Sequence, residues 1–282
     1  MQKVLLVRDL MQSPVIVVRS VDTVAHARNL MLREKVSRLV VVEGDRPVGT
    51  LTRRDIIRSL RNYRLRKRDF ESIIVSEVMR SPVTMVNEED SITDAAKKMV
   101  SGNVKGLPVV DDRGELVGIV TKTDLTRYFS ESFRGRFKVK EISQGREGLP
   151  IIHSSHTVFR AMDLMAETFA DRVIVVDDTK PIGIITETDL SFIRQQRSGN
   201  SFRKGSRRDA EAVSPTRIYL LPTAADVMTP DPTVVNESED AGIAAGMLIE
   251  KGIGGMPVVN KKGDLVGVIT KFDFVKVLAK EV

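Results

Sequence analysis

Apolar positions along this chain follow a helical spacing and then a strand-like run, and this order recurs. Apolar residues at i, i+3, i+4 and i+7 predict amphipathic helices. They are Ile92, Ala95, Ala96 and Met99; Val158, Ala161, Met162 and Met165; and Ala241, Ala244, Ala245 and Leu248. Short apolar runs that predict buried strands follow: LPVV from Leu107, VIVV from Val173 and MPVV from Met256, with RLVVV from Arg38 in an earlier copy.

Each copy opens with a lead segment before its first helix. Three leads share Met-x-x-Pro or a close variant: DLMQSPVIVV from Asp9, EVMRSPVTMV from Glu77 and DVMTPDPTVV from Asp226. Proline excludes helix there and starts an extended segment. The remaining lead, KEISQGREGLPII from Lys140, lacks the methionine and carries extra residues.

Each copy closes with a strand that ends in Gly-x-x-Thr-x-x-Asp, followed by a second helix. The four copies are GTLTRRD, GIVTKTD, GIITETD and GVITKFD, and their aspartates lie 69, 65 and 84 residues apart. Each unit is therefore expected to be β-α-β-β-α. A unit that recurs four times predicts a fold built from four similar repeats.

These motifs resemble the cystathionine-β-synthase (CBS) domain, and the resemblance covers nearly the whole chain. It implies an α/β fold of four β-α-β-β-α repeats that form two Bateman modules in a pseudo-twofold disc. A chain with four such repeats is similar to the gamma subunit of AMP-activated protein kinase and its stand-alone archaeal relatives. The expected division is 1–70, 71–138, 139–195, a basic flexible loop at 196–222, and 223–282, with modules at roughly 1–138 and 139–282.

The resemblance also implies an adenosyl ligand such as AMP, ADP or ATP. The motif aspartate would take the ribose hydroxyls, and the threonine would contact phosphate. The ribose residues would be Asp55, Asp124, Asp189 and Asp273, and the phosphate residues Thr52, Thr121, Thr186 and Thr270. The chemistry fits, because a carboxylate accepts charge-assisted hydrogen bonds and a helix N-terminus offers free amides to an anion.

A structural alternative stays open for this motif. Thr-x-x-Asp is close to a capping box, in which the hydroxyl and the carboxylate satisfy the amides of their own helix. All four copies carry aspartate and none carries Glu or Gln. This uniformity favours a ligand role.

One further position separates odd copies from even ones. Before the second strand, the first and third copies carry Arg38 and Arg172, where the second and fourth carry Gly106 and Gly255. The resemblance implies that a basic residue here reaches phosphates and that glycine leaves room for the adenine or backbone. The alternative is that both arginines are solvated residues at a strand edge.

Positive charge is concentrated in two segments outside the repeated core. Residues 53–68 carry a net charge of +7 and residues 194–217 carry +5, whereas the whole chain carries +6, so the remainder carries −6. A third stretch, FRGRFK from Phe133, interleaves aromatic and basic residues, a composition suited to single-stranded nucleic acid. An anionic partner, RNA or a ribosomal subunit, is therefore predicted, although solvated helix faces and loops have the same composition.

The predicted RNA contacts form one set of basic residues. They are Arg53, Arg54, Arg58, Arg61, Arg64, Arg66, Lys67, Arg68, Arg134, Arg136, Arg203, Lys204, Arg207 and Arg208. A translation-silencing or ribosome-protecting role would follow if docking blocked a functional surface. The alternative is an energy-sensing regulatory subunit that controls a partner enzyme, like the kinase gamma subunit.

Other functional classes find little support. Nearly all the chain is assigned to regulatory repeats and no nucleophile–base set is visible, so we predict no enzyme and no required cofactor. No metal site is predicted, because the chain lacks cysteine and the H-x-x-H of His153 and His156 has no acidic ligand cluster nearby. No apolar run reaches the roughly 18 residues of a membrane span. We expect a cytoplasmic monomer or homodimer.

Overall fold

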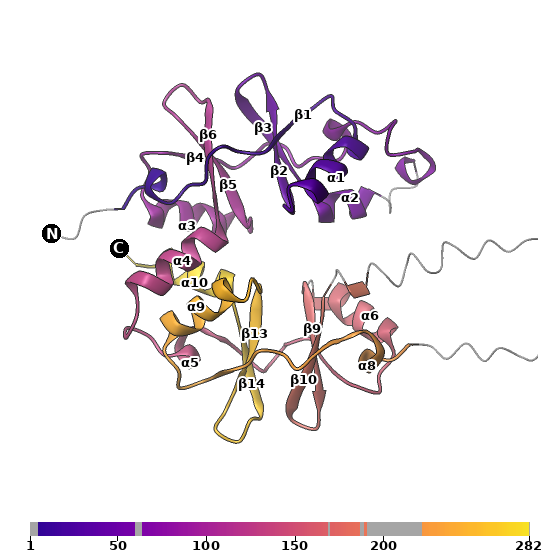
Figure 1. The fold of residues 1–282 in the computed structure, drawn as a ribbon, viewed down its shortest axis with the longest axis vertical. Helices are drawn as coiled ribbons and strands as arrows, with labels where there is room; N and C mark the ends of the chain where they lie inside the picture. Colours follow the sequence, from indigo (N-terminus) through magenta and orange to yellow (C-terminus); the bar gives the residue numbers. More distant parts are fainter. Residues whose placement is uncertain (1–4, 60–63, 169, 187–188, 191–221, 282) are drawn as a thin grey trace, which may run out of the picture. The chain divides into compact units, whose positions relative to one another are not determined.

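The computed structural model describes residues 5–59, 64–168, 170–186, 189–190 and 222–281 (Figure 1). Within these residues the strands form four separate sheets, one for each repeat. The α/β class and the four β-α-β-β-α repeats are confirmed. The predicted amphipathic helices are α3 (Ile92–Ser101), α6 (Val158–Thr168) and α9 (Ala241–Glu250), and their helically spaced apolar residues are buried or half-buried.

The first repeat shows the arrangement that the others follow. Strand β1 (Val17–Arg19) pairs in parallel with β2 (Arg38–Glu43), and α1 (Val24–Arg33) connects them. Strand β2 pairs antiparallel with β3 (Arg46–Thr52), and α2 (Arg53–Ser59) follows directly. A parallel pair needs a crossover and an antiparallel pair needs only a hairpin, so the chain order dictates this topology.

The other repeats use equivalent elements. The second has β4 (Val86–Asn87), α3, β5 (Gly106–Val110), β6 (Leu116–Thr121) and α4 (Lys122–Ser132). The third has β8 (Ile151–His153), α6, β9 (Arg172–Asp177) and β10 (Lys180–Thr186). The fourth has β12 (Val235–Asn236), α9, β13 (Gly255–Val259), β14 (Leu265–Thr270) and α10 (Lys271–Leu278).

Short helical turns and strands make up the leads. They are η1 (Val7–Asp9), η3 (Val75–Glu77), α5 (Val139–Ile142) with β7 (Gln144–Gly145), and α8 (Ala224–Val227) with β11 (Thr229–Pro230). One further turn, η2 (Leu65–Lys67), lies between the first two repeats.

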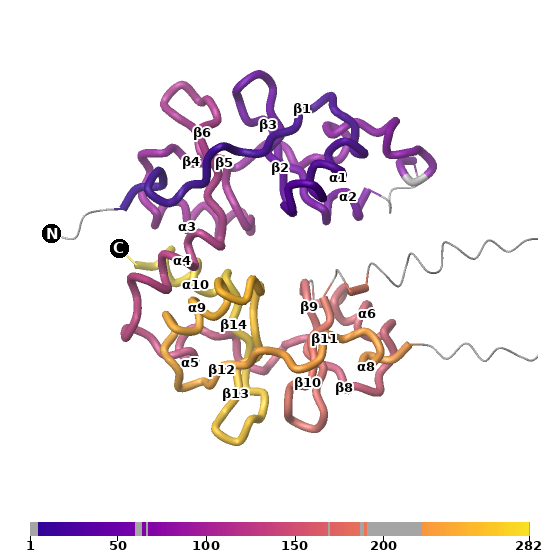
Figure 2. Tube along the Cα trace, viewed as in Figure 1, coloured from indigo at the N-terminus to yellow at the C-terminus, as the bar shows by residue number. Residues whose placement is uncertain are grey.

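Each lead docks on the partner repeat rather than on its own. Gln12 bridges to Ile119 of β6, and Arg80 bridges to Thr50 of β3. In the same way β7 joins β14, and β11 joins β10. Figure 2 shows the first lead running past the second repeat before it enters β1. Two repeats are therefore completed only as a pair.

The motif glycine makes this exchange possible. A β carbon on Gly49 would lie 2.7 Å from Met79 Sδ, and one on Gly118 would lie 2.5 Å from Met11 Sδ. Met228 occupies the same place against Gly183. The degenerate lead of the third repeat docks on the fourth repeat and has no methionine. The backbone of its Gln144 lies against Gly267 instead. The lead methionine and the motif glycine are thus two halves of one contact between partner repeats.

The buried cores contain residues from both partners. In the first repeat, Leu39, Leu51 and Met31 pack with Ile73 and Val75, which belong to the second lead. In the third repeat, the core includes Ala224 of the fourth lead. Burial of these apolar side chains stabilises the pairing of repeats at about 25 cal/mol per Å² removed from water.

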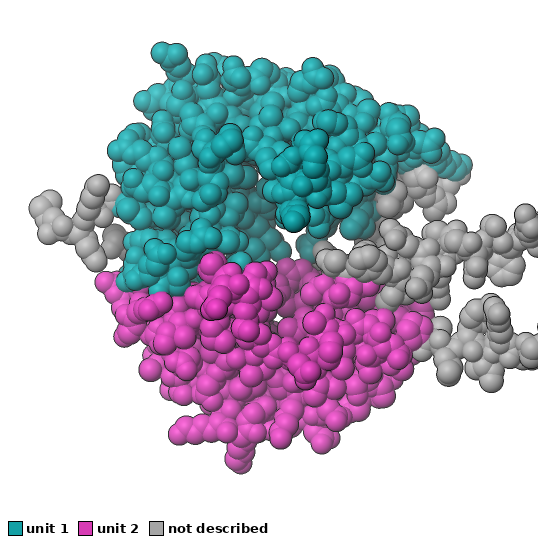
Figure 3. Space-filling view, in the orientation of Figure 1, with its two compact units in different colours: residues 1–132, 271–282 teal, residues 133–270 magenta. Residues whose placement is uncertain are grey.

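The chain divides into two compact units (Figure 3). Unit 1 comprises residues 1–132 and 271–282, and unit 2 comprises residues 133–270. Helix α10 belongs to unit 1, where the ring of Phe274 lies 4.9 Å from that of Phe129 in α4. These units are defined by compactness, so they do not test the predicted boundaries of the repeats. The boundaries and the pseudo-twofold disc stay predictions.

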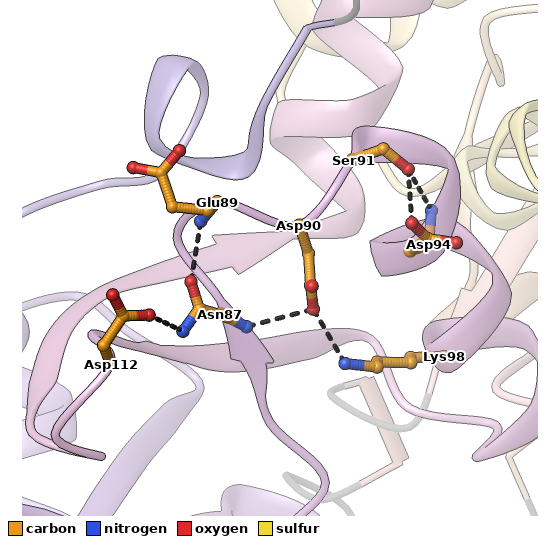
Figure 4. Close-up of polar contacts among 7 residues, drawn as sticks. All are labelled: Asn87, Glu89, Asp90, Ser91, Asp94, Lys98 and Asp112. Carbon is orange, nitrogen blue, oxygen red and sulfur yellow. Dashed lines mark hydrogen bonds and ion pairs between the residues drawn. The ribbon is translucent and has the colours of Figure 1, made fainter.

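A polar turn fixes the start of α3 (Figure 4). The backbone amide of Asn87 donates to Asp90, and its side-chain amide donates to Asp112, both at 3.1 Å. Lys98 Nζ lies 2.9 Å from Asp90 Oδ2. Ser91 then caps α3 by accepting from the amide of Asp94 at 3.0 Å. The bond from Asp94 satisfies an amide that the first helical turn leaves without a partner.

Candidate functional site

Each motif threonine lies where a strand passes into the closing helix. In the second repeat the backbone amide and the hydroxyl of Thr121 donate to Oδ2 of Asp124, at 2.8 and 2.6 Å. The same two bonds join Thr52 to Asp55 and Thr186 to Asp189. The capping interpretation therefore holds for one carboxylate oxygen, Oδ2, and leaves Oδ1 for other partners.

Three of the four motif aspartates are buried, and Asp189 is half-buried. Asp55, Asp124 and Asp273 are 4%, 6% and 2% exposed. A buried carboxylate needs charged or hydrogen-bonding partners, because desolvation disfavours the ionised form.

Side chains from the partner's lead provide partners for Oδ1 in unit 1. Arg80 Nε donates to Asp55 Oδ1 at 2.8 Å, and Gln12 Nε2 donates to Asp124 Oδ1 at 3.2 Å. Each lead thus contacts the motif aspartate of the repeat on which it docks. The exchange of leads is what brings these groups together.

A basic residue three positions after the aspartate recurs in three copies. Arg127 lies 3.7 Å from Asp124 Oδ1, and Lys276 lies 3.1 Å from Asp273 Oδ1. Arg58 has the same spacing from Asp55, and both line one pocket. Residues three apart share a helix face, so the closing helices of the first, second and fourth repeats place a cation beside the carboxylate.

Arg38 fills the space that the glycine of the even repeat leaves. In unit 1 its guanidinium lies where a β carbon on Gly106 would be. Burial lowers the pKa of Arg38, the charge of Asp55 raises it, and the charge of Arg80 lowers it further. The alternative in which Arg38 is a solvated residue at a strand edge does not fit its guanidinium, which lies against Gly106 of the next repeat, and phosphate binding by Arg38 stays a prediction.

Arg172 repeats this arrangement in unit 2. Its guanidinium would contact a β carbon on Gly255, and its Nε donates to Asp171 Oδ1 at 2.9 Å. Its side chain is only 16% exposed. Arg172 and Gly255 occupy equivalent positions in their repeats, since Arg172 pairs with the motif threonine Thr186 and Gly255 pairs with the motif threonine Thr270.

Asp55, Arg58 and Arg80 line a pocket of about 230 Å³. Apolar atoms of Leu65, Val78 and Met79 and the polar groups of Ser59 and Glu77 complete its wall. The pocket lies between the closing helix of the first repeat and the lead of the second. A second pocket of about 260 Å³ is lined by Ser13, Pro14, Val15, Val17, Val42, Gly44, Asp45, Leu116 and Val117, and no motif Thr or Asp lines it.

A buried lysine lies near the second motif aspartate. Lys271, the first residue of α10, is 6% exposed, and its backbone oxygen accepts from the hydroxyl of Thr126 at 3.2 Å. Burial lowers the pKa of Lys271, the charge of Arg127 lowers it further, and Asp124 raises it. Helix α10 therefore adds a cation to the surroundings of Asp124 within unit 1.

The predicted RNA residues have mixed outcomes. Arg61, Arg203, Lys204, Arg207 and Arg208 lie outside the described residues, as does the side chain of Arg66. Arg54 is half-buried. The remaining residues of the set are exposed: Arg53, Arg58, Arg64, Lys67, Arg68, Arg134 and Arg136. RNA binding by this set stays a prediction.

Arg68 and Arg53 form hydrogen bonds within the protein. Arg68 Nη1 donates to Glu77 at 2.7 Å, which lowers the pKa of Glu77, and Arg53 donates to the backbone oxygen of Val36 at 3.1 Å. Hydrogen bonds of this kind hold the guanidinium groups against the protein surface.

The aromatic residues of FRGRFK pack within the protein. Phe133 is 6% exposed and stacks on Phe137, with ring centroids 6.4 Å apart. Arg136 lies over the Phe133 ring at 4.9 Å. The Phe133 ring therefore has a packing role, so base stacking on it is not supported.

His153 and His156 show no metal-binding arrangement. His153 Nε2 lies 3.1 Å from Asp177 Oδ1. Across the described ranges, no group of three or more His, Cys, Asp or Glu side chains is placed to hold a metal ion.

The sequence interpretation missed the Oδ1 partners Arg80 and Gln12 and the following cations Arg127 and Lys276. The cations could have been found from the motif itself, since Asp-x-x-Arg/Lys recurs in three copies. The lead residues could not, because the exchange that brings a lead to the partner repeat is a tertiary property.

Comparisons with known proteins agree with the repeat pattern. The family model of the CBS domain matches residues 7–62, 75–131, 139–194 and 224–280. The protein MJ1225 of Methanocaldococcus jannaschii is 24% identical over 277 residues, covering 94% of this chain and 95% of that protein. MK0525 of Methanopyrus kandleri is 27% identical over 139 residues, covering 49% of this chain and 68% of that protein.

Solved structures show the same fold. The crystal structure of MJ1225, described as a candidate archaeal homologue of γ-AMPK, has a TM-score of 0.75 at 22% identity and covers 98% of this chain and 100% of that chain. An uncharacterized conserved protein from Pyrococcus horikoshii has a TM-score of 0.69 at 21% identity, covering 97% and 100%. Among the residues that the structure describes, no helix is long and apolar enough to cross a membrane.

Proposed function

This chain belongs to the CBS-domain family, and on that premise we propose that it is a non-enzymatic regulatory protein that binds an adenine nucleotide. The ligand is AMP, ADP, ATP or another adenosyl compound, bound between paired repeats. Fold alone does not assign a function, so the proposal depends on the chemistry of the site.

The observation that carries the proposal is the composition of the pocket at Asp55. It combines a buried carboxylate, two guanidinium groups from Arg58 and Arg80, and apolar atoms of Val78 and Met79. A carboxylate accepts the two hydroxyls of a ribose, guanidinium groups match phosphate geometry, and apolar atoms suit a base. Ribose, phosphate and base together make a nucleotide.

Isothermal titration with AMP, ADP, ATP, dinucleoside polyphosphates and S-adenosylmethionine tests this proposal. Asp55→Asn keeps the shape and an oxygen for the helix cap but removes the charge. We expect it to weaken binding by roughly 1.5–3 kcal/mol, the scale of a hydrogen bond to a charged group. Asp163→Asn, a change at an exposed position of α6, is the matched control and leaves affinity unchanged. A folded parent protein that binds none of these ligands would overturn the proposal.

We further propose that the regulated partner is RNA or a ribosomal subunit. Support comes from the distribution of charge, since residues 53–68 and 194–217 carry +12 on a chain whose remainder carries −6. Phosphate contacts by clustered arginines give such association a steep salt dependence. The alternative partner is an enzyme that this chain regulates, and a native pull-down with and without RNase distinguishes the two.

A further inference from the structure

Equivalent positions in the two leads of unit 1 carry side chains of different charge. The residue after the lead methionine is Gln12 in the first lead and Arg80 in the second. Gln12 donates to Oδ1 of Asp124 at 3.2 Å, and Arg80 donates to Oδ1 of Asp55 at 2.8 Å. The two sites are alike in their Thr/Asp pairs and differ in the charge of this lead residue.

We propose, resting on the nucleotide-binding function above, that this lead position selects the ligand of each site. Arg80 restricts the Asp55 site to adenosyl ligands that carry phosphate. Gln12 lets the Asp124 site accept an uncharged nucleoside as well.

The argument begins with the one carboxylate oxygen that a ribose can reach. Oδ2 of both aspartates accepts from the motif threonine and holds the start of the closing helix. Both aspartates are buried and their Oδ1 atoms accept from the lead residues, so a ribose reaches Oδ1 by displacing the lead residue. At Asp124 a hydroxyl replaces an amide, which exchanges one neutral donor for another.

At Asp55 the exchange is unequal. The side chain of Asp55 is 3% exposed and that of Arg80 is 47% exposed, so a buried carboxylate would lose its ion-pair partner. A ribose hydroxyl replaces the hydrogen bond to the carboxylate, but it carries no positive charge and does not replace the ion pair. A ligand without charge therefore gains little at this site.

A phosphate restores the balance. It gives the displaced Arg80 an anionic partner, and Arg58 lines the same pocket. Arg38 lies near both groups, since the charge of Asp55 raises its pKa and the charge of Arg80 lowers it. Glu77 also lines this pocket, but Arg68 pairs with it at 2.7 Å. The guanidinium groups of Arg38, Arg58 and Arg80 therefore outnumber the Asp55 carboxylate and leave a positive surplus that a phosphate neutralises and a nucleoside does not.

The other basic residues do not account for the difference between sites. Arg58 and Arg127 occupy the same position after Asp55 and Asp124, so both sites have that cation. Each site also has one further cation, Arg38 near Asp55 and Lys271 near Asp124. In unit 2 the lead strands place Gln144 beside β14 and Thr229 beside β10. Both are uncharged, so Arg80 is the one charged residue among these four lead positions.

The test counts binding sites for AMP and for adenosine by isothermal titration of the full chain. In the parent protein we expect adenosine to occupy one site fewer than AMP. Arg80→Gln makes the first site resemble the second, so adenosine gains that site and its affinity there rises by roughly tenfold. Gln12→Arg is the reciprocal change, and adenosine loses one site while AMP keeps it. Arg80→Lys keeps the charge and retains the parent pattern.

The outcomes separate this inference from the proposed function. Equal numbers of AMP and adenosine sites in the parent, or adenosine binding that neither exchange alters, overturn the inference and leave nucleotide binding intact. A folded parent that binds neither ligand overturns the proposed function and this inference with it. If Arg80→Gln fails to fold, Gln12→Arg, at an exposed position, decides the question by itself.

Discussion

At the scale of single residues, the same side chains serve the fold and the proposed site. Asp55 and Asp124 each use one oxygen to cap their own helix and the other to bind the lead of the partner repeat. A substitution there changes stability and binding together. Tests of the fold are therefore cleaner at residues away from the motif.

Asp90 offers such a test through pH. Burial raises its pKa, but hydrogen bonds from Lys98 and Asn87 outweigh burial and bring the pKa below the usual 3.8. A carboxyl with a lowered folded pKa stabilises the protein above its unfolded pKa, and this stabilisation is lost as pH falls through the folded value. We expect Asp90→Asn to flatten the dependence of unfolding free energy on pH below about 4. Urea melts at pH 3 and pH 6 measure it, with Asp163→Asn as control; parallel pH profiles would contradict the prediction.

Gly118 tests the contact between lead and motif. An added β carbon would lie 2.5 Å from Met11 Sδ and 2.9 Å from its Cγ. Gly118→Ala should therefore destabilise the protein by about 1–3 kcal/mol, the usual range for overpacking. Chemical denaturation measures the change, and Met11→Ala in the same chain should recover part of it.

Gly246→Ala is the matched control for this substitution. A β carbon at Gly246, inside α9, would meet no atom within 4 Å. Alanine is the better helix former by about 1 kcal/mol, so stability should hold or rise. Equal losses from both substitutions would argue against the lead contact.

At the scale of elements, the caps decide where helices begin. Ser91 accepts from the amide of Asp94 at 3.0 Å and donates to its carboxylate at 2.7 Å, which fixes the first turn of α3. The sequence predicted this helix from its apolar period, and its first residue, Ile92, is the first residue of that period.

Ser91→Ala should destabilise the protein by about 1 kcal/mol, because an N-cap oxygen is lost and an amide of the first turn loses its partner. Thermal and urea unfolding of the two chains measure the difference. Ser101→Ala, at the exposed C-terminal end of the same helix, is the control and should change stability far less. If the two substitutions have equal effects, the cap does not stabilise α3.

At the scale of the whole molecule, positive charge is concentrated in two segments of the sequence. Residues 53–68 and 194–217 carry +12 and the remainder carries −6, although the first segment begins within the first repeat, in its closing helix α2. We predict that replacing Arg61, Arg64 and Arg66 by Glu, and separately Arg203, Lys204, Arg207 and Arg208, reduces co-sedimentation with ribosomes. The loss should grow with salt, since each phosphate contact releases counterions.

Sedimentation at two salt concentrations checks this expectation. Unaltered co-sedimentation of both variants, or none by the parent, would favour the enzyme-regulating alternative. If nucleotide alters RNA affinity, RNA must alter nucleotide affinity by the same factor, because coupling between sites is reciprocal.

The sequence by itself determined the number of repeats, their element order and the Thr/Asp pairs, because these depend on local periodicity and on motifs contiguous in the chain. The apolar spacing of α3, α6 and α9 follows from the helical period alone. The alternation of Arg38 and Arg172 with Gly106 and Gly255 was also visible, but its meaning was not.

Only the tertiary structure decided which groups meet. Arg80 lies 25 residues from Asp55, and Gln12 lies 112 residues from Asp124. No local period reports such contacts, because they arise when each lead docks on the partner repeat. The same docking places Arg38 over Gly106, so that an arginine in one repeat and a glycine in the next fill one space. Local sequence sets the elements, and the packing of two repeats against each other builds the site.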